Sequence, residues 1–194
     1  MGRKALITCA DRYMGPAIRK KFESIGLTVL PSFEALKSES AVDDLLNCCG
    51  DIDIVVANLA EPPQTSPVHK IKTQEWDHLF QTLVYPLMYL VRAFVPQMLE
   101  RGSGKIIAVT SAAPIRGIPN NGAYCAARGA QNSFIKAVGL ELARANIQVN
   151  AIAQNYINND TYYPDDLVDS PKFLDHIKRN VPTNKIGSAE ETAE

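Results

Sequence analysis

The sequence has no marked excess of charge of either sign and no long uninterrupted apolar run. Its 194 residues include 20 Lys and Arg against 21 Asp and Glu, a net charge of −1. A protein that binds nucleic acid or an acidic membrane surface needs a basic patch to neutralise phosphates, and no basic stripe is present here. No apolar run approaches the roughly 18 residues of a membrane span. We therefore expect a protein that binds neither nucleic acid nor a membrane.

Cysteine is scarce and irregularly placed. The four cysteines, Cys9, Cys48, Cys49 and Cys125, have neither the spacing of a metal site nor that of a redox pair. The amino terminus runs directly into a predicted strand, so no signal peptide is expected. Unpaired cysteines without a secretion signal are typical of the cytoplasm, where thiols stay reduced. These features predict a cytoplasmic protein with no bound metal.

Glycine is scarce in the turn between the first predicted strand, residues 4–8, and the first predicted helix, residues 15–26. A dinucleotide-binding fold has a glycine-rich turn here, because only glycine lets the backbone approach the phosphates closely. Residues 9–14 instead read CADRYM, and the only glycine is Gly15. Tyr13 would occupy space that the cofactor needs. The turn therefore argues against a bound nicotinamide cofactor.

Strand and helix patterns alternate along the chain. With 46% hydrophobic and 21% charged residues, the composition is ordinary for a globular protein. Short apolar runs separated by amphipathic segments are typical of a parallel sheet with helices on both faces. We predict one α/β domain over residues 1–194, a Rossmann-like doubly wound sheet. The predicted strands are 4–8, 27–31, 52–58, 104–110 and 147–153, and the predicted helices are 15–26, 39–49, 74–101, 121–144 and 170–180. Pro86 is expected to kink the third of these helices.

The last residues of the sequence begin like a capped helix. Ser188 is a typical N-cap residue, and acidic residues follow it in the first turn. A helix of one or two turns is marginal by itself. We therefore expect the natural chain to continue past residue 194 with a further helix and strand of the same domain, which are missing from this sequence.

Two loops follow predicted strands at the edge of the sheet where ligands bind. In open parallel sheets this edge is formed by the carboxyl ends of the strands. Pro62, Pro63 and Pro67 mark a loop after the third strand, and residues 154–169 form a long polar loop after the fifth. Long loops at this edge are usually functional. The alternative for residues 154–169 is an ordinary surface segment, since Asn and Asp favour turns.

A serine, a tyrosine and an arginine have a spacing that can bring them together. Ser111 follows the fourth predicted strand, Tyr124 lies thirteen residues later, and Arg128 is four residues beyond it on the same helical face. Tyrosine has a pKa of about 10, and a nearby positive charge lowers it, so that the phenolate can act as a base. Ser111 can orient a substrate hydroxyl by a hydrogen bond. Any one of the three alone would be read as an ordinary solvated residue, whereas the combination predicts a catalytic site.

The order Ser–x12–Tyr–x3–basic resembles the short-chain dehydrogenase/reductase superfamily. The usual members have a lysine four residues after the tyrosine and a glycine-rich first turn. This chain has Arg128 in place of the lysine, and Thr8-x4-Tyr13-x-Gly15 in the turn. Both departures resemble one branch, the halohydrin (haloalcohol) dehalogenases. The motifs of that branch, T-x4-F/Y-x-G and S-x12-Y-x3-R, match this sequence at every fixed position.

The resemblance implies a carbon–halide lyase that needs no cofactor. In the implied reaction, Tyr124 as phenolate takes the proton of a vicinal haloalcohol, with Arg128 lowering its pKa and Ser111 orienting the substrate oxygen. The alkoxide attacks the neighbouring carbon, the halide leaves and an epoxide forms. In reverse, small anions open the epoxide. The partners implied are therefore a small haloalcohol or epoxide and a halide ion.

The resemblance also implies a halide pocket and an assembly. Tyr13 and the backbone groups near Asn155, Tyr156 and Ile157 are expected to surround the halide. Tyr162 and Tyr163 are expected to form the wall of the substrate or halide site. Members of the branch are commonly homotetramers built through two long helices, here 74–101 and 121–144, so we expect a homo-oligomer, a dimer or a tetramer.

Two alternatives stay open. The chain could be an NAD(P)-dependent short-chain dehydrogenase/reductase with an unusual first turn, in which nicotinamide binds despite Tyr13. It could also be a catalytically silent relative that serves as a binding or scaffolding subunit, although the complete set of serine, tyrosine and arginine argues against this. His69, His78 and His176 do not cluster in the sequence and are assigned no role.

Overall fold

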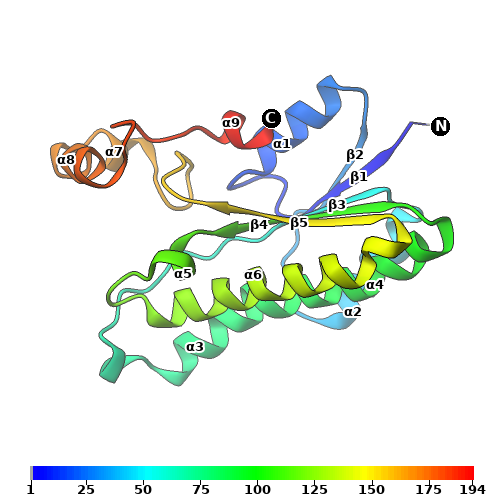
Figure 1. The fold of residues 1–194 in the computed structure, drawn as a ribbon, viewed down its shortest axis with the longest axis horizontal. Coiled ribbons are helices and arrows are strands. Elements are labelled where there is room, and N and C mark those ends of the chain that lie inside the picture. The colour runs from blue at the N-terminus through cyan, green and yellow to red at the C-terminus, as the bar shows by residue number, and fades with distance from the viewer. Residues whose placement is uncertain (1) are drawn as a thin grey trace.

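A parallel sheet of five strands forms the centre of the protein (Figure 1). The computed structural model describes residues 2–194. The strands pair in the order β2-β1-β3-β4-β5, and every pair is parallel. The order reverses between β1 and β3, which is the kind of switch point where open α/β sheets bind ligands. The strands are β1 (Lys4–Ile7), β2 (Thr28–Pro31), β3 (Ile54–Asn58), β4 (Gly104–Ser111) and β5 (Ile147–Gln154).

Helices cover both faces of this sheet (Figure 1). Alternate strand residues face opposite layers: Leu6 and Val55 pack into one buried cluster, and Ile7 and Val56 into the other. Burial on both faces explains why β1 and β3 read as continuous apolar runs. One face is covered by α1 (Gly15–Ser24) and α9 (Ala189–Ala193), and the other by α2 (Glu39–Cys49), α3 (Thr73–Leu79), α4 (Tyr85–Arg101) and α6 (Gly122–Leu142).

Three further helices lie toward the carboxyl ends of the strands, at the left of Figure 1. They are α5 (Ala113–Arg116), α7 (Asp165–Val168) and α8 (Pro171–Asn180). The doubly wound α/β fold, the five strands and the five helical regions expected from the sequence are thus confirmed. Helices α5 and α7 were not predicted, because four residues are too few to produce a helical period of apolar side chains.

The predicted helix 74–101 contains a widened turn immediately before Pro86. Residues Phe80–Val84 form a π-helical segment, η2, between α3 and α4. Proline has no backbone N–H to donate, so regular bonding cannot continue through this point, and the expected distortion lies here. The Leu83 carbonyl accepts a hydrogen bond from Gln131 Nε2 of α6 at 2.7 Å. The irregular turn therefore links this helix to the one that carries Tyr124 and Arg128.

By length and composition, the helical segment Thr73–Arg101 could cross a membrane, with a mean hydropathy of 1.3 over its best 18 residues. The expectation from the sequence concerned an uninterrupted apolar run, and Arg92 interrupts this one. The core helix of a domain such as this passes the same test, because one side of it is apolar where it packs on a sheet. Leu87, Leu90, Phe94 and Met98 of this segment are buried in the larger cluster against the sheet. The segment thus has a packing role that accounts for its hydropathy.

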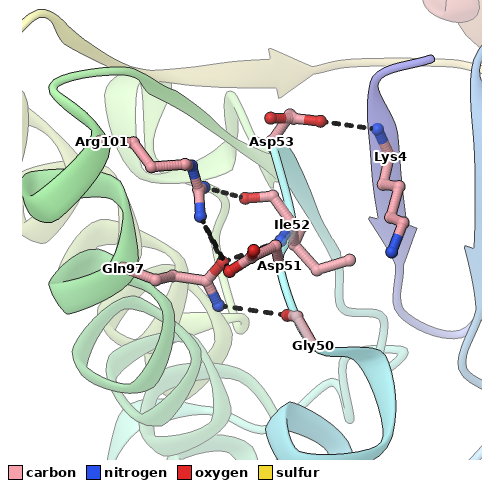
Figure 2. Close-up of polar contacts among 7 residues, drawn as sticks. All are labelled: Lys4, Gly50, Asp51, Ile52, Asp53, Gln97 and Arg101. Atoms are coloured by element: carbon pink, nitrogen blue, oxygen red, sulfur yellow. Dashed lines mark hydrogen bonds and ion pairs between the residues drawn. The ribbon is translucent and has the colours of Figure 1, made fainter. Parts of the chain in front are cut away.

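A polar cluster ties the end of α4 to the loop before β3, at the amino end of that strand (Figure 2). Arg101 donates through Nη2 to the Ile52 carbonyl at 2.6 Å and through Nη1 to Gln97 Oε1 at 2.9 Å. Gln97 Oε1 also accepts from the Ile52 N–H at 2.8 Å. Asp53 Oδ2 accepts from the Lys4 N–H at 2.7 Å, which links the same loop to β1. The cluster fixes the start of β3, and none of its residues lines the cavity described below.

The expected capped helix after Ser188 is confirmed as α9. Ser188 Oγ accepts from the Glu191 N–H at 3.2 Å, and Glu191 Oε2 accepts from the Ser188 N–H at 2.8 Å. This reciprocal capping box satisfies two N–H groups that the first turn leaves unpaired. Ala189 and Ala193 pack on the buried cluster beneath α1, and Lys21 pairs with Glu194. Packing against α1 therefore supports a helix that would be marginal alone. A continuation of the natural chain stays a prediction.

Candidate active site

The turn between β1 and α1 has the backbone of a glycine-rich turn without its glycines. Cys9 and Tyr13 have φ values of 47° and 58°, in the left-handed region that non-glycine residues rarely adopt. Gly15 is indispensable, because a Cβ there would lie 2.5 Å from the Cys9 carbonyl oxygen. From β3, Asn58 Nδ2 donates to the Cys9 and Arg12 carbonyls at 3.0 and 3.1 Å. The surrounding structure therefore holds the turn in a shape that its own sequence does not favour.

Tyr13 and Asp160 fill the place in this turn where a dinucleotide fold holds phosphate. The Tyr13 N–H, at the entrance to α1, donates to Asp160 Oδ1 at 3.3 Å. The Tyr13 hydroxyl donates to Gln154 Oε1, at the end of β5, at 2.7 Å. Burial raises the pKa of Tyr13 to about 12, so its hydroxyl is neutral near pH 7. A carboxylate on the N–H and a ring across the strand ends do not fit a dinucleotide diphosphate.

Arg128 is a fully buried cation with no carboxylate partner. Its exposed fraction is 0%, and no ion pair within residues 2–194 includes it. Its Nε donates to the Tyr124 hydroxyl at 3.1 Å, and its Nη2 donates to the Tyr162 hydroxyl at 2.7 Å. Its Nη1 donates to the Val109 carbonyl at 3.3 Å and to Gln131 Oε1 at 2.9 Å. All four acceptors are formally neutral, so the charge is solvated only by dipoles.

The charge on Arg128 is nevertheless secure. Burial would lower the pKa of Arg128, but the adjacent tyrosines, with Tyr162 first, outweigh burial and raise it above its ordinary value. A buried charge without a counterion is costly, because the interior solvates it poorly. The environment of Arg128 therefore favours a negative charge at a neighbouring atom. The two atoms placed to carry it are the hydroxyl oxygens of Tyr124 and Tyr162.

These two tyrosines differ in what becomes of the hydroxyl proton. Tyr162 donates its proton to the Glu61 carbonyl at 2.9 Å and also accepts from the Glu61 N–H at 3.0 Å. Burial raises the pKa of Tyr162 despite Arg128, which keeps it neutral. Among residues 2–194, the Tyr124 hydroxyl takes part in no hydrogen bond other than the one it accepts from Arg128, and the side chain lines a cavity. Tyr124 is therefore the better placed of the two to exchange a proton with a bound molecule.

Gln131 holds Arg128 in place and was not identified from the sequence. It is 1% exposed and lies three residues after Arg128 on α6. Its Oε1 accepts from Arg128 Nη1, while its Nε2 donates to the Leu83 carbonyl in the π-helical turn. The Leu83 carbonyl can only accept, so the Gln131 NH2 group must face it and the Gln131 oxygen must face Arg128. Gln131 thus positions the guanidinium without contacting the cavity.

Ser111 lies at the last position of β4, beside Tyr124 on the cavity wall. Its Oγ accepts from the Ala113 N–H at 3.1 Å, and its carbonyl accepts from Asn132 Nδ2 at 3.1 Å. No hydrogen bond within residues 2–194 uses the Ser111 hydroxyl proton. The side chain is therefore oriented by α5 and free to donate into the cavity.

The predicted site residues surround one cavity of about 400 Å³ at the carboxyl edge of the sheet. Arg128 lies beneath its wall and contacts it through Tyr124 and Tyr162. Tyr163 also faces the cavity, and burial raises its pKa to about 12. The predicted residues that line the cavity are Tyr13, Ser111, Tyr124, Asn155, Tyr156, Ile157, Tyr162 and Tyr163. The structure thus brings all nine predicted residues to one place.

The loop after β5 lines this cavity and contains backbone donors that are not used within residues 2–194. No hydrogen bond within residues 2–194 uses the N–H of Asn155, Tyr156 or Ile157. Tyr156 has a φ of 50°, and a left-handed residue within a run of such donors makes a concave nest that attracts anions. The loop is anchored from outside by Gly187, whose N–H donates to the Tyr156 carbonyl at 2.9 Å. That these backbone groups surround a halide stays a prediction.

A second polar group on the cavity wall was missed by the sequence analysis. Arg116 of α5 and His176 of α8 both bond the Tyr156 hydroxyl, at 3.3 Å from Arg116 Nη2 and 2.8 Å from His176 Nε2. Tyr156 is a predicted residue, but its two partners lie 40 residues before and 20 residues after it. No short-range pattern indicates such a cluster, because it forms only when α5, the loop and α8 meet. Within residues 2–194, no three His, Cys, Asp or Glu side chains are placed to hold a metal.

Comparisons with known proteins agree on the superfamily. A family model described as enoyl-(acyl carrier protein) reductase matches residues 34–194. The chain is 28% identical to 3-oxoacyl-(acyl-carrier-protein) reductase from Haemophilus influenzae, over 99% of this chain and 88% of the relative. It is 34% identical to a sorbitol dehydrogenase from Cereibacter sphaeroides, over 97% of this chain and 82% of the relative. Both relatives are named as oxidoreductases.

Solved structures with the same fold include dehalogenating enzymes. One, described as a dehalogenation enzyme, has a TM-score of 0.89 and 27% identity, and the match covers 99% of this chain and 88% of that one. Another is a halohydrin dehalogenase bound to ethyl (2S)-oxiran-2-ylacetate, with a TM-score of 0.87 and 24% identity over 98% and 86% of the two chains. The second likeness is one of fold alone.

Proposed function

The chain belongs to the short-chain dehydrogenase/reductase superfamily, and within it we propose that the protein is a carbon–halide lyase that needs no nicotinamide. The proposed reaction converts vicinal haloalcohols to epoxides with release of halide. It is supported by the two motifs of the halohydrin dehalogenase branch and by the structural neighbour described as a dehalogenation enzyme. Serine, tyrosine and a basic residue serve the reductases as well, so they do not decide between the two reactions.

The observation that carries the proposal is the filled turn between β1 and α1. Asp160 accepts from the Tyr13 N–H, and the Tyr13 hydroxyl is bonded across to Gln154 at 2.7 Å. To admit a diphosphate, a carboxylate would have to leave this N–H and a buried ring would have to move. A halide is smaller and needs only N–H donors and weakly polar walls. The loop after β5 offers such donors at residues 155–157.

The chemical step needs a base, an oriented oxygen and a place for the leaving anion. Tyr124 as phenolate accepts the hydroxyl proton of the substrate while Arg128 Nε stabilises the negative oxygen. The Ser111 hydroxyl donates to the same substrate oxygen and aligns it with the neighbouring carbon. The C–O bond forms as the carbon–halogen bond breaks, and the halide leaves with the electron pair. Tyr124 then returns its proton to water.

A redox reaction is the second candidate, since the named sequence relatives are reductases and dehydrogenases. It would use the same Ser111, Tyr124 and Arg128 to polarise an alcohol or carbonyl. Nicotinamide binding would require Tyr13 and Asp160 to leave their present positions. The two candidates therefore differ in whether NADH or NADPH binds at all.

Assembly forms part of the same proposal. We propose that the protein is a homo-oligomer built through α4 and α6. Tyr85 and Leu99 on α4 and Leu140 on α6 are exposed by 45%, 48% and 83%, and these apolar side chains support the proposal.

The test of the function is bromide release from 1-bromo-2-propanol by purified protein with no nicotinamide added. Tyr124→Phe removes the base but keeps the ring, and we expect it to abolish release. Lys20→Gln changes an exposed side chain of α1, outside the cavity and outside α4 and α6, and we expect it to match the natural protein. No bromide release by the natural protein, or equal release by the Tyr124→Phe variant, would overturn the proposal.

A further inference from the structure

The part of the cavity wall that α5 and α8 form is basic. Among the residues that line the cavity, Arg116 and His176 are the only ones that can carry positive charge, and none is Asp or Glu. Arg116 forms no ion pair within residues 2–194, and the only hydrogen-bond partner of its guanidinium there is the Tyr156 hydroxyl. With Arg128 buried beneath the same cavity, the field inside it attracts anions.

The hydrogen bonds around His176 determine which of its nitrogens carries the proton. Asn180 Nδ2 donates to the His176 carbonyl at 2.8 Å, which fixes the orientation of that amide. The same Nδ2 lies 3.3 Å from His176 Nδ1, so Nδ1 is the acceptor and the neutral ring carries its proton on Nε2. His176 Nε2 therefore donates to the Tyr156 hydroxyl at 2.8 Å.

The Tyr156 hydroxyl consequently accepts two hydrogen bonds and keeps its own proton to donate. Arg116 and His176 supply the two bonds that it accepts, and no acceptor for its proton is found within residues 2–194. Tyr156 is 7% exposed and lines the cavity, so its position is well defined by packing. The unused N–H groups of Arg116 and the hydroxyl proton of Tyr156 are therefore a set of hydrogen-bond donors without an acceptor within residues 2–194.

We propose that Arg116 and Tyr156, with His176 orienting the tyrosine, bind a carboxylate on the substrate. The inference rests on the proposed function and narrows its substrate class to haloalcohols that carry an acidic group, the halo-hydroxy acids. The guanidinium is suited to this, since its planar set of donors matches the two oxygens of a carboxylate. Ser111, Tyr124 and this group line one cavity of about 400 Å³, which has room for a short acid with its hydroxyl at Tyr124.

The test compares an acid with its uncharged amide of the same shape. Bromide release from 4-bromo-3-hydroxybutanoate and from 4-bromo-3-hydroxybutanamide gives the ratio of kcat/KM for the two substrates. We expect the natural protein to favour the acid by about two- to fivefold, the size of one ion pair between exposed groups. Arg116→Gln and Tyr156→Phe should lower that ratio toward one. Arg144→Gln, an exposed arginine outside the cavity, is the matched control and should leave it unchanged.

A binding measurement separates this inference from the lyase reaction itself. Unreactive 3-hydroxybutanoate is titrated calorimetrically into the natural protein and into the Arg116→Gln variant. Weaker binding to the variant supports the carboxylate site even if no bromide is released, in which case only the lyase proposal fails. Bromide release with equal kcat/KM for acid and amide, unchanged by Arg116→Gln, would overturn the carboxylate site and leave the lyase proposal standing.

Discussion

Replacement of Arg128 by lysine tests how the buried guanidinium acts on the base. Arginine makes four hydrogen bonds from three nitrogens, to the Tyr124 and Tyr162 hydroxyls, the Val109 carbonyl and Gln131 Oε1. Lysine has three donors on one nitrogen and cannot reach all four acceptors. We expect the bond to the Tyr124 oxygen to be lost. The phenolate then loses stabilisation relative to the neutral phenol, while the positive charge remains nearby.

The size of the effect follows from the bond that is lost. A hydrogen bond to a charged group contributes about 1.5–3 kcal/mol, and about 1.4 kcal/mol corresponds to a factor of ten, or one pH unit. Loss of phenolate stabilisation means that higher pH is needed to form the base. The acid limb of the profile of kcat/KM against pH should therefore move upward by about one to two units in Arg128→Lys.

The assay is bromide release followed from about pH 5 to 10, with thermal unfolding as a check that the variant is folded. Arg92→Lys, on the exposed side of α4, is the matched control and should leave the profile unchanged. A uniform loss of rate at every pH, with the acid limb in its original place, would refute the reasoning. Arg128 would then position the substrate or Tyr124 without stabilising the phenolate.

Three further predictions concern Gln131, the buried tyrosines and Arg101. Gln131→Leu leaves Arg128 Nη1 and the Leu83 carbonyl with one partner fewer. It should move the acid limb upward, as Arg128→Lys does, but by a smaller amount. The pH profile of bromide release checks this, since a purely structural role would not move the acid limb. Folding raises the pKa of Tyr13 and Tyr163 to about 12, above the unfolded value of about 10. The free energy of unfolding, measured in urea, should therefore fall as pH rises from about 10 to 12. Below about pH 9 these two tyrosines should have no effect on it. Arg101→Met removes the bond to the Ile52 carbonyl and should lower the free energy of unfolding by about 1 kcal/mol, measured in urea, with bromide release unchanged; an unaltered stability would contradict the role assigned to the cluster in Figure 2.

The strands and long helices were predictable because their signals are local. Apolar runs marked the five strands, and Ser188 with its acidic first turn marked the start of α9. Ser111, Tyr124 and Arg128 were found because a fixed spacing carries them onto one strand end and one helical face. The turn at Tyr13 was found because a residue type was missing where the backbone needed it.

The features that were missed depend on tertiary contacts. Gln131 reads as an ordinary helical residue until the π-helical turn before Pro86 presents the Leu83 carbonyl to it. Arg116 and His176 lie far apart in the sequence and meet only through the Tyr156 hydroxyl. The separate behaviour of Tyr162, whose proton is taken by the Glu61 carbonyl, likewise requires the folded loop. Such groups have no periodic or motif-like signal in one sequence.

The central claim is that the substrate's own alkoxide displaces halide to form an epoxide, without nicotinamide. The most direct measurement is the ratio of bromide released to epoxide formed from 1-bromo-2-propanol, in protein shown by fluorescence titration not to bind NADH or NADPH. The account predicts one epoxide for each bromide, with no response to either nucleotide. Tight binding of NADH or NADPH, with no bromide released, would contradict it and would mean that Tyr13 and Asp160 move aside to admit a cofactor.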